Sequence, residues 1–276
     1  MRVLVTGAGG QLGSDLAALL SDVVALDRHG LDISNGGAVL AAVREARPDV
    51  VFNCAAYNAV DQAEREANMA LAVNWLGVRN LADACAVSGA RLVHFSTNFV
   101  FAGDAAEPYT ETDEARPLSV YGDSKLKGEQ AALAEPSALV VRSSGLFGVR
   151  GSAVKGGSFP ERIVARARSG ERIRVVSDQR LNPTFTRHLA QAVIGYVEAG
   201  LTGVVHAVAD GCCGYSDLAR EALRLAGLDV EVEEIASAEL AAPAKRPLNG
   251  CLRSVRVDPL PDWRRGLGEW WTAFEK

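Results

Sequence analysis

Tyr121 and Lys125 stand four residues apart, a spacing that puts both side chains on one face of a helix. A cation beside a phenol favours the phenolate, so Lys125 is expected to lower the pKa of Tyr121. A phenol tuned in this way can pass a proton to or from a carbonyl or alcohol oxygen. Upstream, Ser96-Thr97 offers a hydroxyl that could hold that oxygen. This spacing also occurs by chance on many helices. Further motifs are therefore needed to indicate whether the two residues are catalytic.

A glycine-rich turn lies at the start of the chain. The apolar run at residues 1–5 is followed by Gly7-Ala8-Gly9-Gly10-Gln11-Leu12-Gly13 and then by helical apolar spacing at residues 14–20. Strand, glycine turn and helix in this order are the context of a dinucleotide-binding fingerprint. Gly7 allows the tight turn, Gly10 lets backbone approach a pyrophosphate, and Gly13 allows close packing of helix on strand. The alternative is an ordinary turn between a strand and a helix.

The next strand, at residues 23–26, ends in Asp27. An acidic residue at this position is expected to accept hydrogen bonds from the adenosine ribose hydroxyls. Arg28 follows at once and could instead neutralise a 2′-phosphate. These neighbours point in opposite directions, so the choice between NADH and NADPH stays open.

Further apolar strands alternate with helical segments. Residues 50–53 end at Cys54-Ala55-Ala56, and residues 91–95 deliver Ser96 and Thr97. This alternation predicts an α/β fold with a doubly wound parallel sheet of the Rossmann-like kind. Ligands of such sheets lie beyond the carboxyl ends of the strands, where the glycine turn, Asp27 and Thr97 would meet. That convergence is the main argument for function.

Beyond Gly145 the chain becomes glycine-rich, basic and less regular. We predict a dinucleotide-binding domain at residues 1–145 and a smaller C-terminal substrate lobe at residues 146–276. Roughly residues 173–208 are expected to rejoin the main sheet, through a strand at 173–176 and a helix at 188–198. His206 lies within an apolar run and is expected to be a satisfied core histidine; the tail tryptophans Trp263, Trp270 and Trp271 are expected to pack.

Composition excludes several classes of protein. The chain is 48% hydrophobic and 23% charged, as ordinary globular proteins are. No apolar run could span a bilayer, and residues 1–5 already form a strand, so we expect no signal peptide, no membrane partner and a cytoplasmic location. A formal charge of -5 argues against nucleic-acid binding. Without a Cys-x-x-Cys pair, the cysteines are expected to be reduced structural thiols with no metal site: Cys54, Cys85, Cys212, Cys213 and Cys251.

The charge is uneven along the chain. Between Arg142 and Arg187 stand ten lysines and arginines against three acids, and a second basic cluster contains Lys245 and Arg246. A basic middle in an acidic protein suggests a local anionic ligand such as a diphosphate, and a solvated helix face is the alternative. The acids Asp61, Glu64 and Glu66 are expected on a solvated helix face rather than at a metal.

Several motifs together resemble the extended short-chain dehydrogenase/reductase superfamily, and most closely its dTDP-4-dehydrorhamnose reductase family. The resemblance covers nearly the whole length. It rests on the glycine turn, Ala25-Leu26-Asp27, NCAAYNAVDQAERE from Asn53, STNFVF from Ser96, PLSVYGDSKLKGE from Pro117, DQRLNPT from Asp178, KRPLNGCL from Lys245, and Leu260-Pro261-Asp262-Trp263. It implies a nicotinamide-dependent reductase acting on a nucleotide-linked 4-keto-6-deoxysugar, and a homodimer is compatible with it.

Position by position, the resemblance makes Tyr121 the proton donor, Thr97 the catalytic hydroxyl and Lys125 the ligand of the nicotinamide ribose. It places Gln11 and Leu12 at the pyrophosphate. The adenosine half would be framed by Asp32, Ile33, Ala55, Ala56 and Tyr57. For the substrate diphosphate our candidates are Arg180, Lys245 and Arg246.

The chain departs from the family pattern on the sugar side. Asn98 replaces an aspartate after Thr97, and Gly145 stands where a tryptophan lies against the sugar. Ser158 and Gly250 replace an asparagine and a serine. These changes predict a 4-ketoreductase whose sugar need not be dTDP-4-dehydrorhamnose itself, as in an enzyme that tailors deoxysugars.

Two alternatives remain at this point. A nucleotide-sugar epimerase or dehydratase would share Thr97, Tyr121 and Lys125 but would recycle tightly bound NAD rather than consume NAD(P)H. A non-catalytic NADP-binding regulatory subunit, resembling the β subunit of methionine adenosyltransferase, would co-purify with a partner and turn over no keto sugar.

Overall fold

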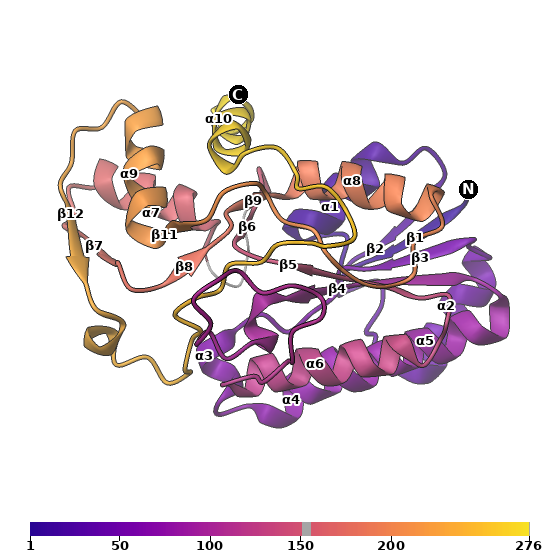
Figure 1. Cartoon of the computed structure of the whole chain (residues 1–276). Coiled ribbons are helices and arrows are strands. Elements are labelled where there is room, and N and C mark those ends of the chain that lie inside the picture. The colour runs from indigo at the N-terminus through magenta and orange to yellow at the C-terminus, as the bar shows by residue number, and fades with distance from the viewer. Residues whose placement is uncertain (151–155, 276) are drawn as a thin grey trace.

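A six-stranded parallel sheet forms the centre of the computed structural model, which describes residues 1–150 and 156–275 (Figure 1). The strand order is β10-β5-β4-β3-β1-β2, and every pairing is parallel. The strands are β1 (Val3–Thr6), β2 (Val23–Leu26), β3 (Val50–Asn53), β4 (Arg91–Thr97), β5 (Leu139–Ser143) and β10 (Gly203–His206). The predicted doubly wound α/β fold is confirmed.

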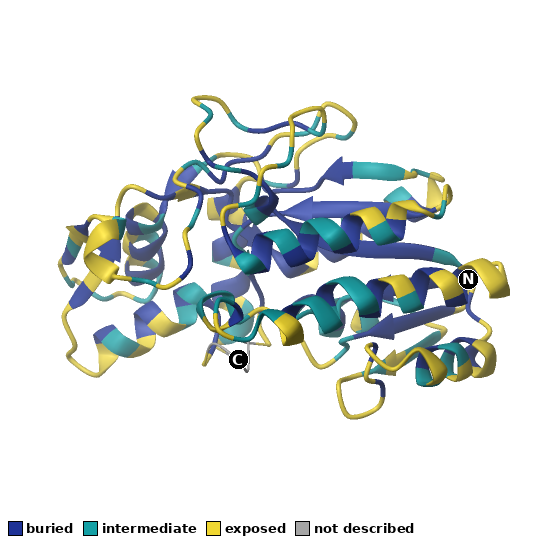
Figure 2. Ribbon diagram, turned by 90° about the horizontal axis from the view of Figure 1, so that it is seen from below, coloured by how far each residue is buried: buried dark blue, intermediate teal, exposed yellow. Residues whose placement is uncertain are grey.

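Helices cover both faces of this sheet. One face carries α1 (Gln11–Leu19) and α8 (Thr186–Glu198), and the other carries α2 (Gly36–Ala46), α5 (Gly77–Ser88) and α6 (Val120–Leu133) (Figure 1). Side chains alternate along the strands, so Val3 and Val5 join the core under α1 and α8 while Leu4 joins the core under α2 and α5. Both faces are covered, and the central strands are accordingly buried along their length (Figure 2).

Short helical segments lie between β3 and α5 and after β4. They are α3 (Val60–Ala63), α4 (Ala67–Leu71), the π-helical turn η1 (Ala72–Leu76) and the 3₁₀ turn η2 (Asn98–Val100). The order of the sheet reverses between β1 and β3, because the chain leaves β1 toward β2 and then crosses to β3 on the other side. Such a switch point opens a crevice at the carboxyl ends of the two strands.

The C-terminal part forms a smaller lobe beside the sheet, on the left in Figure 1. Its strands are β6 (Leu146–Phe147), β7 (Ile173–Val176), β8 (Arg180–Leu181), β9 (Thr184–Phe185), β11 (Cys213–Gly214) and β12 (Val232–Ile235). Its helices are α7 (Phe159–Arg168), α9 (Tyr215–Leu225), the 3₁₀ turn η4 (Ser237–Leu240) and α10 (Trp263–Phe274). Trp263 and Trp270 are buried in the core of this lobe, where they pack as expected.

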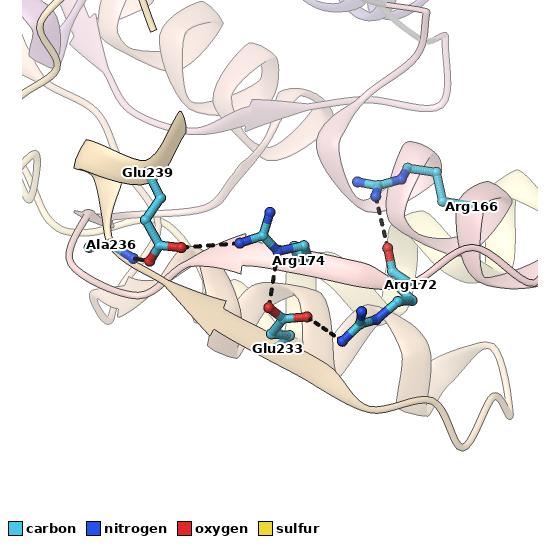
Figure 3. Close-up of polar contacts among 6 residues, drawn as sticks. All are labelled: Arg166, Arg172, Arg174, Glu233, Ala236 and Glu239. Carbon is cyan, nitrogen blue, oxygen red and sulfur yellow. Dashed lines mark hydrogen bonds and ion pairs between the residues drawn. The ribbon is translucent and has the colours of Figure 1, made fainter. Parts of the chain in front are cut away.

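β7 departs from the prediction. It pairs with β12 in a separate two-stranded sheet, so the expectation that residues 173–176 return to the main sheet is wrong. Ion pairs join β7 to β12 and to η4. Arg174 on β7 contacts Glu233 on β12 at 3.0 Å and Glu239 on η4 at 3.1 Å (Figure 3). The helix α8 and the edge strand β10 do lie with the main sheet. A domain boundary at residue 145 stays a prediction.

The expectation of five reduced thiols is wrong for one pair. Cys212 and Cys251 are joined by a disulfide, with Cα atoms 6.0 Å apart. Asn182 brings their segments together, since its amide nitrogen donates to Gly211 O at 3.0 Å and its amide oxygen accepts from Leu252 N at 2.8 Å. Neither contact could be predicted from the spacing of the cysteines.

Candidate active site

Two acceptors fix the start of α6, the helix that carries Tyr121 and Lys125. Ser119 Oγ accepts from Gly122 N at 3.2 Å, and Glu64 Oε1 accepts from Val120 N at 2.9 Å. Tyr121 therefore lies in the first turn and Lys125 one turn later on the same face. Both are buried, with exposed fractions of 8% and 2%. Glu64 is thus a helix cap, and its predicted position on a solvated face is wrong.

Thr97 meets Tyr121 because a glycine lets α6 approach the end of β4. A Cβ atom at Gly122 would lie 2.3 Å from Phe99 O. The rings of Phe99 and Tyr121 pack edge to face, with centroids 5.5 Å apart. The Tyr121 hydroxyl donates to Asn58 Oδ1 at 3.4 Å, and the Thr97 hydroxyl lies near enough to lower the pKa of Tyr121. The structure therefore brings together the hydroxyl, phenol and amine that the sequence singled out.

Burial, rather than charge, controls the phenol. Burial raises the pKa of Tyr121 to about 12, and the Thr97 hydroxyl opposes this shift. Lys125 does not contribute to this shift, and its Nζ donates instead to Phe95 O at 2.6 Å. The expectation that Lys125 keeps the phenol acidic is wrong in this structure. A phenol with a raised pKa is fully protonated at neutral pH and can serve as a proton donor.

The glycine turn fits a dinucleotide. Gly7 has a φ of 66°, and a Cβ atom there would lie 2.5 Å from Ala55 N, so only glycine lets the turn lie against the end of β3. Gly10 precedes α1 and has no side chain to accept from its first N–H groups. These groups can therefore receive a phosphate. Leu12 is 6% exposed and packs in the core, so only its backbone can face that phosphate.

The adenosine end of the predicted cofactor site is open. Asp27 and Arg28 are exposed, and backbone N–H groups of Gly30 and His29 hold the pKa of Asp27 below its usual value. Asp32 is also exposed, but its carboxylate accepts from Ser34 N and Ser34 Oγ. Ile33 is 2% exposed and packs in the core, so it can only anchor the segment that carries Asp32.

Asn74 braces the loop that follows β3, and sequence reasoning missed it. Its amide oxygen accepts from Tyr57 N at 2.8 Å, and its nitrogen donates to Tyr57 O and to Ser124 Oγ, both at 3.0 Å. Asn74 thus ties the residues Ala55, Ala56 and Tyr57 to α6. It lies in the π turn η1, a geometry that is frequent at functional sites. An asparagine among the apolar residues of a helical stretch is the signal that could have revealed it.

On the sugar side, two of the departures from the family pattern touch each other. Asn98 Nδ2 donates to Gly250 O at 3.1 Å, and Ser144 Oγ donates to the same oxygen at 3.2 Å. A Cβ atom at Gly250 would lie 2.2 Å from Asn98 Nδ2, so a serine would not fit there unless Asn98 moved. Gly145 has a φ of 57° and packs against Leu181. Ser158 instead caps α7 in a capping box with Glu161.

The three predicted diphosphate ligands differ in their surroundings. Arg180 and Lys245 are exposed. Arg246 is half-buried and forms a bidentate ion pair with Asp61, at 3.0 and 2.7 Å. The Asp61 side chain is 44% exposed on α3, as predicted, but its pairing with Arg246 was not predicted. Elsewhere in the basic stretch acids neutralise much of the charge, as Arg172 and Arg174 show at Glu233 (Figure 3), while Lys155 lies outside the described residues.

Within the described ranges, no three His, Cys, Asp or Glu side chains gather closely enough to hold a metal ion. Across residues 1–150 and 156–275, no helix combines the length and the apolar character that crossing a membrane requires.

Comparisons with known proteins agree with this geometry. The family model described as RmlD substrate binding domain matches residues 1–275. A dTDP-4-dehydrorhamnose reductase of Streptomyces griseus is 39% identical, over 99% of this chain and 94% of that protein. A dTDP-4-keto-6-deoxy-D-glucose reductase of Streptomyces niveus is 38% identical, over 96% of this chain and 95% of that protein. The structure of a Bacillus anthracis dTDP-4-dehydrorhamnose reductase in complex with NADP is 33% identical, with a TM-score of 0.93 and 99% of both chains covered.

Proposed function

The chain belongs to the RmlD substrate-binding-domain family, and from this we propose that it reduces the 4-keto group of a dTDP-linked 6-deoxysugar with NADPH or NADH. One observation carries the chemistry: Thr97, Tyr121 and Lys125 gather at the carboxyl edge of the sheet, beside a turn that fits a dinucleotide. The named relatives supply the class of substrate.

The residues of the candidate site have separate roles in this reaction. Thr97 and Tyr121 hold the carbonyl oxygen of the sugar, and Tyr121 gives it a proton as negative charge develops there. The glycine turn and the first N–H groups of α1 hold the pyrophosphate of the cofactor, with Asp27 and Arg28 at its adenosine end. When bound, the nicotinamide supplies the hydride. Lys125 would hold its ribose, and the surrounding burial excludes water from the oxygen that is protonated.

An assay of dTDP-4-keto-6-deoxyhexoses tests this proposal. We expect stoichiometric oxidation of NADPH or NADH with at least one sugar of the panel, because a reductase consumes its cofactor. The departures at Asn98, Gly145 and Gly250 predict that dTDP-4-dehydrorhamnose need not be the best substrate. Isomerised or dehydrated sugar without net cofactor consumption would identify an epimerase or dehydratase instead, and a panel without turnover would refute the proposal.

The exposed cations Arg180 and Lys245 are proposed to bind the substrate diphosphate, and the already paired Arg246 is left out of this set. Arg180→Ala is expected to raise KM for the nucleotide sugar about tenfold or more at unchanged kcat, because a charge-assisted hydrogen bond contributes about 1.5–3 kcal/mol. Arg172→Ala is the matched control, since Arg172 is also exposed but pairs with Glu233 in the lobe (Figure 3). Equal KM values for both variants would remove Arg180 from the site.

A cytoplasmic location and a homodimer both stay predictions. Light scattering of the purified chain measures its oligomeric state and so tests the homodimer.

A further inference from the structure

A buried chain of polar side chains lies behind Lys125. It crosses three neighbouring strands, from Thr6 on β1 through Asn53 on β3 to His94 on β4. Thr6 Oγ1 donates to Asn53 Oδ1 at 2.7 Å, Asn53 Nδ2 lies 3.1 Å from His94 Nδ1, and His94 Nε2 lies 3.3 Å from Lys125 Nζ. None of the four side chains is more than 2% exposed. The proposed reaction uses only the last of them.

The orientation of the Asn53 amide is fixed by a donor that has no alternative. Ala55 N donates to Asn53 Oδ1 at 3.2 Å, and a backbone N–H can only donate. The amide oxygen therefore faces Thr6 and Ala55. Because Asn53 and His94 are direct partners in the register of β3 and β4, the amide nitrogen must face His94 Nδ1.

This orientation decides which nitrogen of His94 carries the proton. The amide nitrogen of Asn53 only donates, so Nδ1 of His94 must accept. Burial holds the pKa of His94 well below its usual value, so the ring is neutral. A neutral imidazole that accepts at Nδ1 carries its proton on Nε2. The N–H of Nε2 then points at Lys125 Nζ.

An ammonium group cannot accept this hydrogen bond, because it has three donors and no lone pair. A neutral amine can, while still donating to Phe95 O at 2.6 Å. We propose that Thr6, Asn53 and His94 are positioning residues, which hold an N–H against Lys125 Nζ and so favour its neutral amine form. The proposal rests on the proposed function only in taking Lys125 as part of the catalytic group.

The surroundings of Lys125 lower its pKa and so bring the ammonium and the amine close in free energy. Burial lowers the pKa of Lys125 to about 8, and Glu129 on its own helix opposes the shift. Burial raises the pKa of the Cys54 thiol beyond β3, so this neighbour is neutral where Lys125 titrates. His94 is the ionisable group that faces it from β4. A Cβ atom at Gly128 would lie 3.3 Å from His94 Nε2 and 2.1 Å from Asn74 O, so this glycine lets α6 come close enough for the contact. With a pKa of about 8, Lys125 titrates slightly above neutral pH, so one hydrogen bond can shift the balance between its ammonium and amine forms.

The ¹⁵N spectrum of the histidine rings tests the tautomer directly, in the unaltered protein and without substrate. We expect His94 to carry its proton on Nε2 across the neutral range. His206 is an internal control of opposite kind, since its Nδ1 lies 3.1 Å from Tyr109 O and 3.0 Å from Arg253 O, which only accept. A proton on Nδ1 of His94, or a charged ring at neutral pH, would overturn the proposal even if no variant folded.

The variant His94→Gln tests the effect on Lys125. Its amide can turn an oxygen toward Nζ and stabilise the ammonium, so the titration midpoint of Lys125 should rise by about one pH unit or more, a tenfold change in its acid constant. [¹³Cε]lysine spectra follow this midpoint, and the pH dependence of kcat should move by the same amount. His188→Gln, a buried histidine on α8 that pairs with Glu269, should leave both unchanged.

Failure of the role of His94 and failure of the proposed function give different results. Turnover of a keto sugar with an unmoved Lys125 midpoint in His94→Gln would sink the role of His94 and leave the proposed function intact. The expected tautomer and midpoint shift without turnover of any keto sugar would leave the buried chain intact and overturn the proposed function.

Discussion

Replacing Tyr121 by phenylalanine is expected to lower kcat by about 10²–10⁴-fold, the usual contribution of a general acid. The change removes one hydroxyl and keeps the ring, whose edge-to-face contact with Phe99 holds the start of α6 in place. Cofactor affinity should stay nearly unchanged, because the glycine turn and Lys125 are intact. Steady-state kinetics with a reactive keto sugar and a fluorescence titration with NADPH measure the two quantities.

The control is Tyr196→Phe, on α8 and away from Thr97 and Lys125. Its kcat should equal that of the unaltered protein. If Tyr121→Phe also kept its kcat, another group would have to donate the proton. A parallel loss of NADPH binding would instead show that the variant disturbs the turn at which the cofactor is proposed to bind.

Replacing Arg142 by methionine is expected to lower the free energy of unfolding by about 3–5 kcal/mol, because it leaves a buried carboxylate without its partner. Arg142 and Glu129 form a bidentate pair at 2.9 and 2.6 Å, with side chains only 7% and 2% exposed. Arg142 also lies over the ring of Phe101, with its guanidinium carbon 5.1 Å from the ring centroid. The pair joins β5 to α6 one turn beyond Lys125.

Chemical denaturation measures this loss, and a double variant separates charge from packing. Arg142→Met with Glu129→Leu should recover much of the stability, since no unpaired charge remains. Arg116→Met is the surface control: its pair with Asp104 is exposed and should contribute less than about 1 kcal/mol. A double variant whose loss equals the sum of its two single losses would contradict the assignment.

Local pattern and chain order were enough to predict the edge of the sheet where the candidate site lies. Gly7, Ala55 and Thr97 each follow an apolar strand, and parallel strands end at the same edge. The helical spacing of Tyr121 and Lys125 then placed the catalytic helix beside them. His206 was also predicted correctly as a satisfied core histidine, because a lone polar residue within a buried strand must find partners.

Long-range partners escaped prediction for a physical reason. Asp61, Glu64 and Glu66 follow one another on a polar stretch, which is typical of a solvated face, yet Asp61 meets Arg246 and Glu64 meets Val120. Such pairs form only after the lobe and α6 pack against this stretch. The same holds for β7, whose apolar pattern fits either sheet. Asn53 and His94 are partners in the register of β3 and β4. Aligning the predicted ends of the two strands could have revealed this contact.

The wide turn η1 also sets the rotational phase of the helical stretch from α4 to α5. Adding one residue to a helical turn delays all later residues by about 100° around the axis. Asn74, within this turn, faces Tyr57 and Ser124, while Val78 and Leu81 of α5 face the core. One continuous helical stretch, interrupted by a single irregular turn, thus packs against the core and also holds the catalytic helix through polar contacts.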